Sequence, residues 1–292
     1  MSPALDGARR IALTFDDAPT GPGAFFSGAE RTARIVGHLS EAGVAAAMFF
    51  VRTDGIASHG GAARLAAYVA AGQALANHGH SHLALSKTPL DRFVDDLDRA
   101  ADALDGIGPH APFFRYPYLD EGRALEVQTR MAEALEARGL RPGHVSVCTY
   151  DFYLQDLVDQ HLARGVRLDM DGLGAVYCDL MVRSAAFYER VARESLGRTP
   201  AHILLLHEND LAALYLGRLI AALRTEGWRI VPAQEAYADP VYALSAETTF
   251  RNQGHIAALA HAGGAKRRDL VPLEEEEDHI AARFSRECVA PE

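Results

Sequence analysis

Short hydrophobic runs of strand length alternate with longer stretches of helical spacing over about the first 240 residues. The short runs predict strands at Ile11–Phe15, Val44–Val51, Ala74–Ala76, Ala111–Phe114, His144–Thr149, His202–Leu206 and Trp228–Val231. The longer stretches predict helices at Glu30–Ala42, Gly60–Ala71, Pro89–Leu104, Ala124–Arg138, Arg183–Ser195 and Leu211–Arg224. Such alternation is typical of a parallel sheet covered by helices.

Polar residues that could carry chemistry follow five of the predicted strands, where each strand ends. A (β/α) barrel gathers its reactive groups at this face, because the carboxyl ends of all its strands meet there. An open doubly wound sheet would instead carry a glycine-rich phosphate loop, and neither GxGxxG nor GxxxxGK[ST] is present. The pattern therefore predicts a TIM-like (β/α) barrel.

The periodic pattern weakens after Pro240. We expect a barrel over residues 1–240 and a C-terminal extension over 241–292 that wraps the barrel or is partly mobile. The acidic run Glu274–Asp278 in this extension is typical of a solvated segment.

Charge and composition exclude several classes of protein. With 29 Lys and Arg against 39 Asp and Glu, the net charge is −10, which argues against a nucleic-acid partner. No apolar run reaches the length of a transmembrane segment. The first ten residues, MSPALDGARR, predict no signal peptide, so we expect a cytoplasmic protein unless the N-terminus was trimmed after export. The three cysteines predict no disulfide framework.

Two adjacent carboxylates, Asp16 and Asp17, end the first predicted strand. Taken alone they are typical of a turn, since aspartate favours turns. A second cluster, Asn77-His78-Gly79-His80-Ser81-His82, places three histidines within five residues, and imidazole is a common zinc ligand.

The spacing of His78 and His82 would place both rings on one face of a helical turn, with His80 facing elsewhere. Two histidines and one carboxylate leave positions for water and substrate, as in a catalytic metal site. We expect Asp17 to be the third ligand of one divalent ion, with zinc the expected metal. Asp16 would then lie beside a metal-activated water and act as its general base.

Four motifs occur in the order and with the spacings of one known family: TFDD (Thr14–Asp17), N-H-x-x-x-H (Asn77 to His82), R-x-P-Y (Arg115 to Tyr118) and L-x-L-H (Leu204 to His207). In these motifs the chain resembles the polysaccharide deacetylases, the NodB-homology group or carbohydrate esterase family 4, over about residues 10–240. The resemblance implies a distorted barrel of seven or eight strands. It also implies a hydrolase that removes acetyl groups from N- or O-acetylated sugars and does not act on peptide bonds.

The resemblance also implies roles for single residues. Asp16 matches the catalytic base, and Arg115 matches the arginine that orients it. Asp17, His78 and His82 match the metal ligands. Tyr118 matches the residue whose backbone N–H stabilises the oxyanion.

His207 matches the general acid, which protonates the leaving amine. In the family an aspartate keeps this histidine cationic, but Cys148 stands at that aspartate's position. We therefore expect Asp151 to be the partner of His207, with Asp156 as a second choice. Two further departures, Gly79 for a threonine or serine and Phe152 for a tryptophan, affect the expected specificity more than the chemistry.

Two other interpretations remain open. One is another metal-dependent barrel hydrolase, either an amidohydrolase that acts on a small N-acyl compound or a related phosphoesterase, because His78 to His82 also contains the HxH pattern. The other is an inactive carbohydrate-binding relative. The acylated substrate and the oligomeric state are not determined by the sequence.

Overall fold

The computed structural model describes residues 8–290, so the first seven residues, which belong to the segment examined for a signal peptide, lie outside it. Seven strands form one sheet in which all neighbouring pairs are parallel. The strands are β1 (Arg10–Ala18), β2 (Met48–Val51), β3 (Ala74–Asn77), β4 (Phe113–Phe114), β5 (Arg141–Pro142), β6 (Ala201–His207) and β7 (Arg229–Ile230).

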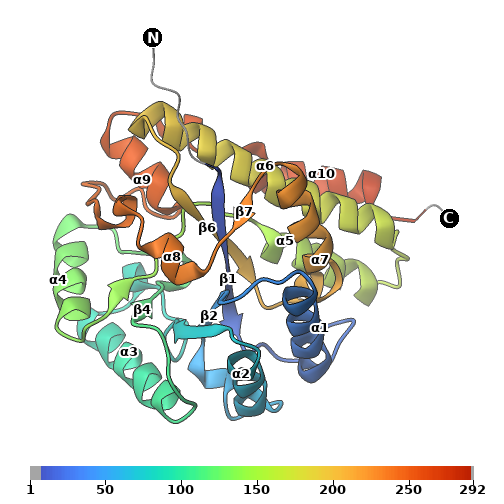
Figure 1. Cartoon of the computed structure of the whole chain (residues 1–292), viewed down its shortest axis with the longest axis horizontal. Coiled ribbons are helices and arrows are strands. Elements are labelled where there is room, and N and C mark those ends of the chain that lie inside the picture. Colours follow the sequence, from blue (N-terminus) through green and yellow to red (C-terminus); the bar gives the residue numbers. More distant parts are fainter. Residues whose placement is uncertain (1–7, 291–292) are drawn as a thin grey trace.

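The spatial order of the sheet is β5-β4-β3-β2-β1-β6, with β7 paired to the start of β1. In Figure 1 β1 and β6 run side by side through the centre of the molecule. They are in register over seven residue pairs, from Arg10 opposite Ala201 to Asp16 opposite His207. The register therefore brings the first aspartate and the last histidine of the motifs to the same edge.

One segment joins the two outer edges of the sheet. Its first residues form β5 on β4, and a few residues later Val147 makes a parallel bridge to Leu204 of β6. The sheet therefore curls round on itself, which confirms the predicted distorted barrel. The predicted strand His144–Thr149 is reduced to this bridge, with β5 lying just before it.

Ten helices lie within the described residues and surround the sheet (Figure 1). They are α1 (Gly28–Glu41), α2 (Gly61–Ala70), α3 (Leu90–Asp105), α4 (Leu125–Glu136), α5 (Asp151–Ala163), α6 (Met170–Leu196), α7 (Asp210–Thr225), α8 (Ala233–Tyr237), α9 (Gly254–Ala262) and α10 (Glu277–Glu287). Short 3₁₀ turns lie at Thr53–Gly55, Leu85–Lys87, Pro117–Leu119, Pro240–Ala243, Arg267–Asp269 and Leu273–Glu275.

Local sequence explains where several helices begin. Ser27 and Glu30 form a reciprocal capping box at the start of α1, and Asn209 caps α7 by accepting the N–H of Ala212. Helix α6 ends at Gly197, whose φ of 66° suits glycine. The sequence did not predict α5, whose apolar residues show little helical segregation.

The chain beyond residue 240 contains α9 and α10, and both pack on α6. The expectation of a solvated acidic run is wrong at Glu275. This side chain is buried, and its Oε1 accepts the hydroxyl of Tyr188 on α6. The division of the chain at residue 240 stays a prediction.

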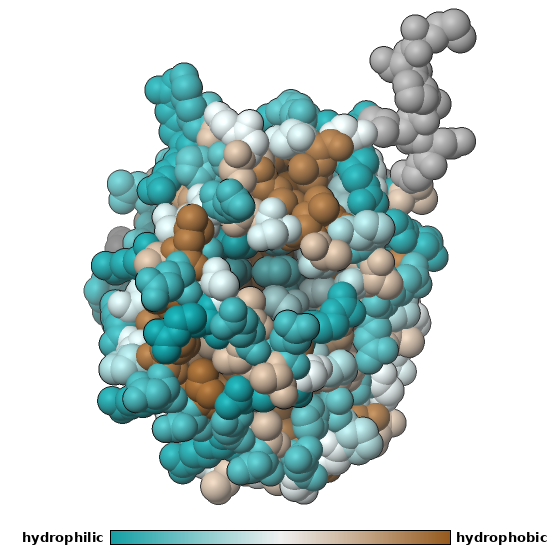
Figure 2. Space-filling model, turned by 90° about the vertical axis from the view of Figure 1, so that its left-hand side faces the viewer, coloured by the Kyte–Doolittle hydropathy of each residue, from teal (hydrophilic) through white to brown (hydrophobic). Residues whose placement is uncertain are grey.

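Buried residues from β1, β2, β3 and β6 form the main hydrophobic core, together with the inner faces of α1, α6 and α7. Hydrophilic side chains cover most of the face in Figure 2, and hydrophobic residues gather in separate patches, one of them in the upper part of the view. None of the helices in residues 8–290 is long and apolar enough to cross a membrane.

Candidate metal centre and active site

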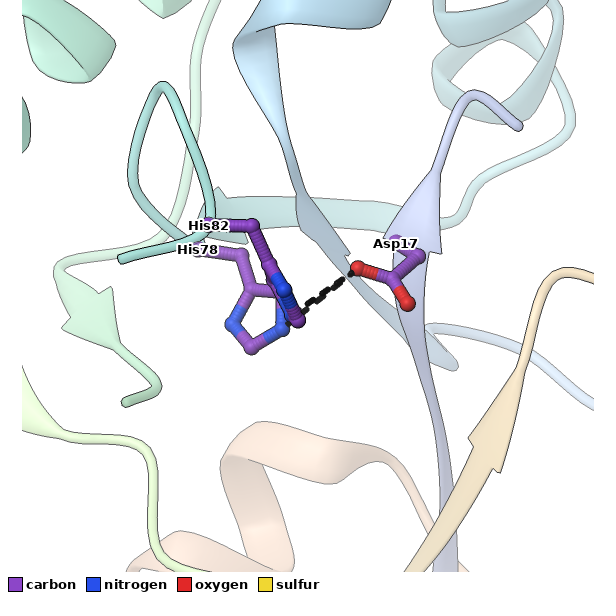
Figure 3. Close-up of side chains that lie close together, drawn as sticks. All are labelled: Asp17, His78 and His82. Carbon is purple, nitrogen blue, oxygen red and sulfur yellow. Dashed lines mark ion pairs between the residues drawn. The ribbon is translucent and has the colours of Figure 1, made fainter. Parts of the chain in front are cut away.

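Asp17, His78 and His82 bring their ligand atoms within 4.8 Å of one another. Nε2 of His82 lies 3.3 Å from Oδ1 of Asp17, and Nε2 of His78 lies 3.8 Å from the same oxygen. Figure 3 shows the three side chains pointing toward one another, Asp17 from β1 and the two histidines from the loop after β3. Oδ1 of Asp17 is buried without a hydrogen-bond partner. An orphaned carboxylate oxygen facing two imidazole nitrogens fits a divalent cation.

The protonation states of the triad also suit metal binding. Nδ1 of His78 lies 2.8 Å from the carbonyl oxygen of Arg115, so this nitrogen carries the proton and Nε2 is left free for a ligand. Burial lowers the pKa of His82 to about 4, although the charge of Asp17 opposes this, so its ring is neutral at pH 7. Burial raises the pKa of Asp17, but nearby histidines, His78 first, bring it below the ordinary value.

The expected helical turn between the two histidines is wrong, because residues 78–82 form a loop. Gly79 has a φ of 79° and His82 a φ of 53°, both in the left-handed region. The carboxylate of Asp96 on α3 accepts the backbone N–H groups of His80 and Ser81. A side chain at position 79 would bring its Cβ to 3.1 Å from Asp96. This contact and the positive φ explain the glycine there.

His80 lies outside the triad, but in a loop and not in the helical turn on which that expectation rested. Its Nδ1 contacts the hydroxyl of Thr53 at 2.9 Å, so it helps to join two loops of the site.

Asp16 is buried beside the triad and is held by Arg115. Nη1 of Arg115 donates to Oδ1 of Asp16 at 2.6 Å, while the other oxygen, Oδ2, lies 3.7 Å from Nε2 of His78. One carboxylate oxygen is therefore fixed by the guanidinium, and the second faces the metal ligands.

Further hydrogen bonds and one aromatic ring hold the side chain of Arg115 in place. It donates to Thr14, to the carbonyl oxygen of Gly143 and to the hydroxyl of Tyr237, and its guanidinium lies 3.8 Å from the centroid of the Phe50 ring. Sequence reasoning missed Tyr237, because it lies in α8 outside every motif.

His207 and Asp151 form a second pair in the site, and His207 lies opposite Asp16 in the register of β1 and β6. Nδ1 of His207 lies 2.7 Å from Oδ1 of Asp151, and the backbone N–H of His207 donates to Oδ2 of the same carboxylate. Burial lowers the pKa of His207, but the charge and hydrogen bond of Asp151 outweigh it and raise the pKa to about 9. Asp151 is fully buried, whereas Asp156, the second choice from the sequence, is exposed.

A cavity of about 290 Å³ lies between the triad and His207. Besides Asp16 and these ionisable groups, its wall is formed by Tyr118, Leu119, Cys148, Thr149, Tyr150, Phe152, Leu205 and Asn252. The side chain of Tyr118 is 64% exposed, and its ring packs edge-on against His82. The ring of Phe152 packs edge-on against His207. Asn252 comes from the C-terminal extension, so that extension contributes to the cavity wall.

Residues 6–141 match the family model described as polysaccharide deacetylase. This segment contains the triad, Asp16, Arg115 and Tyr118, whereas His207 and Asp151 lie beyond it. No curated protein matches the chain.

Three solved structures illustrate the likeness in fold. The CE4 domain of a multidomain xylanase from the hindgut metagenome of Trinervitermes trinervoides is 18% identical, with a TM-score of 0.50, over 79% of this chain and 90% of that one. A CE4 family pseudoenzyme from Bacillus anthracis is 16% identical, with a TM-score of 0.51, over 79% and 66%. A mutant of that pseudoenzyme with restored enzymatic activity is 17% identical, with a TM-score of 0.51, over 79% and 68%.

At these identities the structural likeness shows the fold, and this fold occurs in both active and inactive proteins. The sequence match to the polysaccharide deacetylase model agrees with the resemblance found in the motifs and covers the part of the chain that contains three of them. Residues 6–141 of this chain are thus similar in sequence to the polysaccharide deacetylases, and its fold is that of CE4 proteins.

Proposed function

We propose that this protein is a metal-dependent deacetylase that removes acetyl groups from an N- or O-acetylated sugar, with one divalent ion, zinc as expected, held by Asp17, His78 and His82. The observation that carries the proposal is the unpartnered Oδ1 of Asp17 facing two imidazole nitrogens at the wall of the cavity. When bound, such an ion would polarise the acetyl carbonyl and make water more acidic.

Asp16 acts as the general base in this proposal. Its Oδ1 is occupied by the guanidinium of Arg115, which leaves Oδ2 to accept a proton on the side of the metal ligands. Arg115 fixes the direction of the carboxylate, since three further hydrogen bonds, to Thr14, Gly143 and Tyr237, hold the guanidinium in place.

His207 acts as the general acid. Because its Nδ1 is engaged by Asp151, the proton available to substrate is on Nε2, and His207 lines the cavity. An amine is a poor leaving group until it is protonated, so a cationic imidazole that lines the same cavity as Asp16 suits amide hydrolysis. We assign the backbone N–H of Tyr118, beside His82, to the developing oxyanion.

The cavity wall supports an uncharged substrate. Apart from the groups given roles above, its lining residues carry no charged side chain, and three of them are aromatic: Tyr118, Tyr150 and Phe152. Aromatic rings can cover the apolar face of a sugar ring, and Asn252 offers an amide to its hydroxyl groups. The net charge of −10 does not favour a polyanionic glycan.

The proposal is tested with a panel of acetylated substrates, comprising chito-oligosaccharides, acetylated xylan, small N-acyl amines and an aryl acetate. Acetate release is measured with protein from which the metal has been removed by a chelator, and again after zinc or cobalt is added. We expect release only with metal, and fastest from an acetylated sugar. The absence of turnover on the whole panel would support the inactive relative instead.

The Asp16→Asn variant separates chemistry from binding. It should keep the metal and lose about 10²–10⁴-fold in turnover, because an amide does not accept the proton. Near-normal turnover would show that the base lies elsewhere.

Metal stoichiometry addresses the amidohydrolase alternative. Within residues 8–290 the three triad residues form one cluster capable of holding an ion. We therefore expect one metal per chain, and two would favour a binuclear amidohydrolase or phosphoesterase.

A further inference from the structure

Asp17 has an unusual backbone conformation. Its φ is 67°, in the left-handed region that non-glycine residues adopt in only a few per cent of cases. Such a conformation persists only when its surroundings hold it in place. The residues that hold the chain on either side of Asp17 therefore bear on the direction of its carboxylate.

On the N-terminal side, the carbonyl oxygen of Asp16 accepts the backbone N–H of Glu208 at 3.0 Å. On the C-terminal side, three residues after Asp17, Thr20 contacts the same glutamate. The N–H of Thr20 donates to Oε2 of Glu208 at 2.8 Å, and the hydroxyl of Thr20 lies 2.7 Å from both Oε2 and the carbonyl oxygen of Glu208. Glu208 therefore binds the chain on both sides of Asp17.

Glu208 is fully buried and paired with a buried arginine. Nη2 of Arg64 lies 2.6 and 2.8 Å from its two carboxylate oxygens, and the hydroxyl of Tyr68 donates to Oε1 at 2.9 Å. Nη1 of Arg64 also donates to the carbonyl oxygen of Thr20. Helix α2 thus supplies the charge that keeps the glutamate in place.

A second buried pair supports the same loop. Arg31 donates twice to Oδ1 of Asp210 and once each to the hydroxyl of Thr20 and the carbonyl oxygen of Gly21. The other oxygen of Asp210 accepts the N–H of Phe25. Residues 20–25 are therefore attached to the end of β6 by two buried ion pairs.

We propose that Glu208 is a positioning residue that, through Thr20 and its ion pair with Arg64, holds Asp17 in the left-handed conformation that aims its carboxylate at His78 and His82. None of its carboxylate hydrogen bonds goes to a catalytic group, so it acts through the backbone of the loop. This inference rests on the metal site of the proposed function.

The chain offers a matched control at the opposite end of the same two strands. Asp239 is also buried, and its carboxylate contacts Arg10 at the start of β1 and accepts the N–H of Ala201 at the start of β6. Each of the two variants therefore neutralises one buried carboxylate that joins β1 to β6. Glu208→Gln does so beside the site, and Asp239→Asn does so at the far end of the strands.

Two properties are measured on both variants and on the wild-type protein: Co²⁺ affinity by calorimetry, and amide exchange of residues 16–20 in metal-free protein. We expect Glu208→Gln to lower Co²⁺ affinity by about 10- to 100-fold and to speed exchange at the N–H of Thr20. Asp239→Asn should lower the melting temperature without changing either property.

Less than tenfold loss of Co²⁺ affinity in Glu208→Gln would overturn the inference, as would an equal loss in Asp239→Asn. If wild-type protein binds no Co²⁺, the proposed metal site fails separately, and unchanged exchange at Thr20 then overturns the positioning role. Should Glu208→Gln not fold, Thr20→Val removes the hydroxyl and leaves both ion pairs. We expect it to weaken Co²⁺ binding by about threefold or more, and wild-type affinity would refute the inference.

Discussion

The carboxylate of Asp151 holds His207 through both of its oxygens, one on the ring at 2.7 Å and one on the backbone N–H at 2.9 Å. The two residues are 56 positions apart, and Asp151 begins α5 while His207 ends β6. One buried side chain therefore orients the imidazole and is the largest cause of its raised pKa.

We predict that Asp151 sets the alkaline limit of activity. With a pKa of about 9, His207 is cationic below that pH and loses its proton above it, so amide hydrolysis should fall as pH rises through about 9. In Asp151→Asn the largest cause that raises the pKa of His207 is gone, and burial opposes only the charges of Asp17 and Asp16, which should move the limit down by about one pH unit or more. The pH profile of acetate release from an N-acetyl substrate measures this.

An aryl acetate serves as the control for that profile, since a phenolate leaves without a proton. Its hydrolysis should show little of the alkaline decline. An unmoved alkaline limit in a folded Asp151→Asn protein would contradict the role of His207 as acid.

The metal ligands are tested by comparing neighbouring histidines. His82→Ala should lose the divalent ion, because its Nε2 faces Asp17 at 3.3 Å. His80→Ala should retain the ion, since the His80 ring contacts Thr53. Metal content after dialysis, measured by atomic emission, distinguishes them, and metal loss from His80→Ala alone would show that the ligand set is wrong.

Tyr237→Phe should mainly affect stability. Burial raises the pKa of Tyr237 to about 12, so its hydroxyl stays protonated, accepts from Arg115 and donates to the carbonyl oxygen of His144. Removing it leaves a buried donor of Arg115 unpaired, and urea unfolding should report a loss of about 1–3 kcal/mol.

Turnover of Tyr237→Phe should fall less than that of Asp16→Asn, because the bond from Arg115 to Asp16 remains. Tyr242→Phe, which removes a buried hydroxyl near the start of β6, is the control and should leave turnover unchanged. Equal effects of the two substitutions on turnover would argue against a link from Tyr237 to the base.

Glu275 should make stability depend on pH. Burial raises its pKa to about 8, although hydrogen bonds from Tyr188 and Cys148 oppose this, against an ordinary value of 4.5. Because the folded state keeps the proton longer than the unfolded state, the stabilisation is full below about pH 4.5 and is lost as pH rises through about 8.

The slope contributed by this group is at most about 1.4 kcal/mol per pH unit. Glu275→Gln should flatten the dependence between these values, which urea unfolding at several pH values would measure. Parallel curves for the variant and the wild-type protein would show that Glu275 is ionised in the folded state.

The sequence predicts the chemistry-bearing residues well where they follow strands. Four of them meet at one edge of the sheet because their strands are parallel and neighbouring: Asp16, Asp17, His78 and His207. The alternation of predicted strands and helices along the sequence is enough to indicate this arrangement. The contact between Asp151 and His207 was also expected, from the motif in which Asp151 and Phe152 follow the predicted strand.

Features that depend on tertiary contacts were not predictable in the same way. The loop from His78 to His82 follows the position of Asp96 on α3, and no spacing within the loop reveals that contact. Tyr237, Glu208 and Glu275 are polar residues whose burial depends on distant elements. The periodicity of a sequence indicates which face of a helix is exposed. It does not indicate which polar side chains are buried and form hydrogen bonds with residues of distant elements.

The stretch that closes the sheet also connects the two proton-transfer groups. The carbonyl oxygen of Gly143 accepts Nε of Arg115, which holds the base, and eight residues later Asp151 holds the acid. Between them Val147 is fixed to β6. Inserting or deleting one residue here would shift the supports of acid and base together, so natural variation in length should be rarer in this stretch than in any loop that touches only one of them.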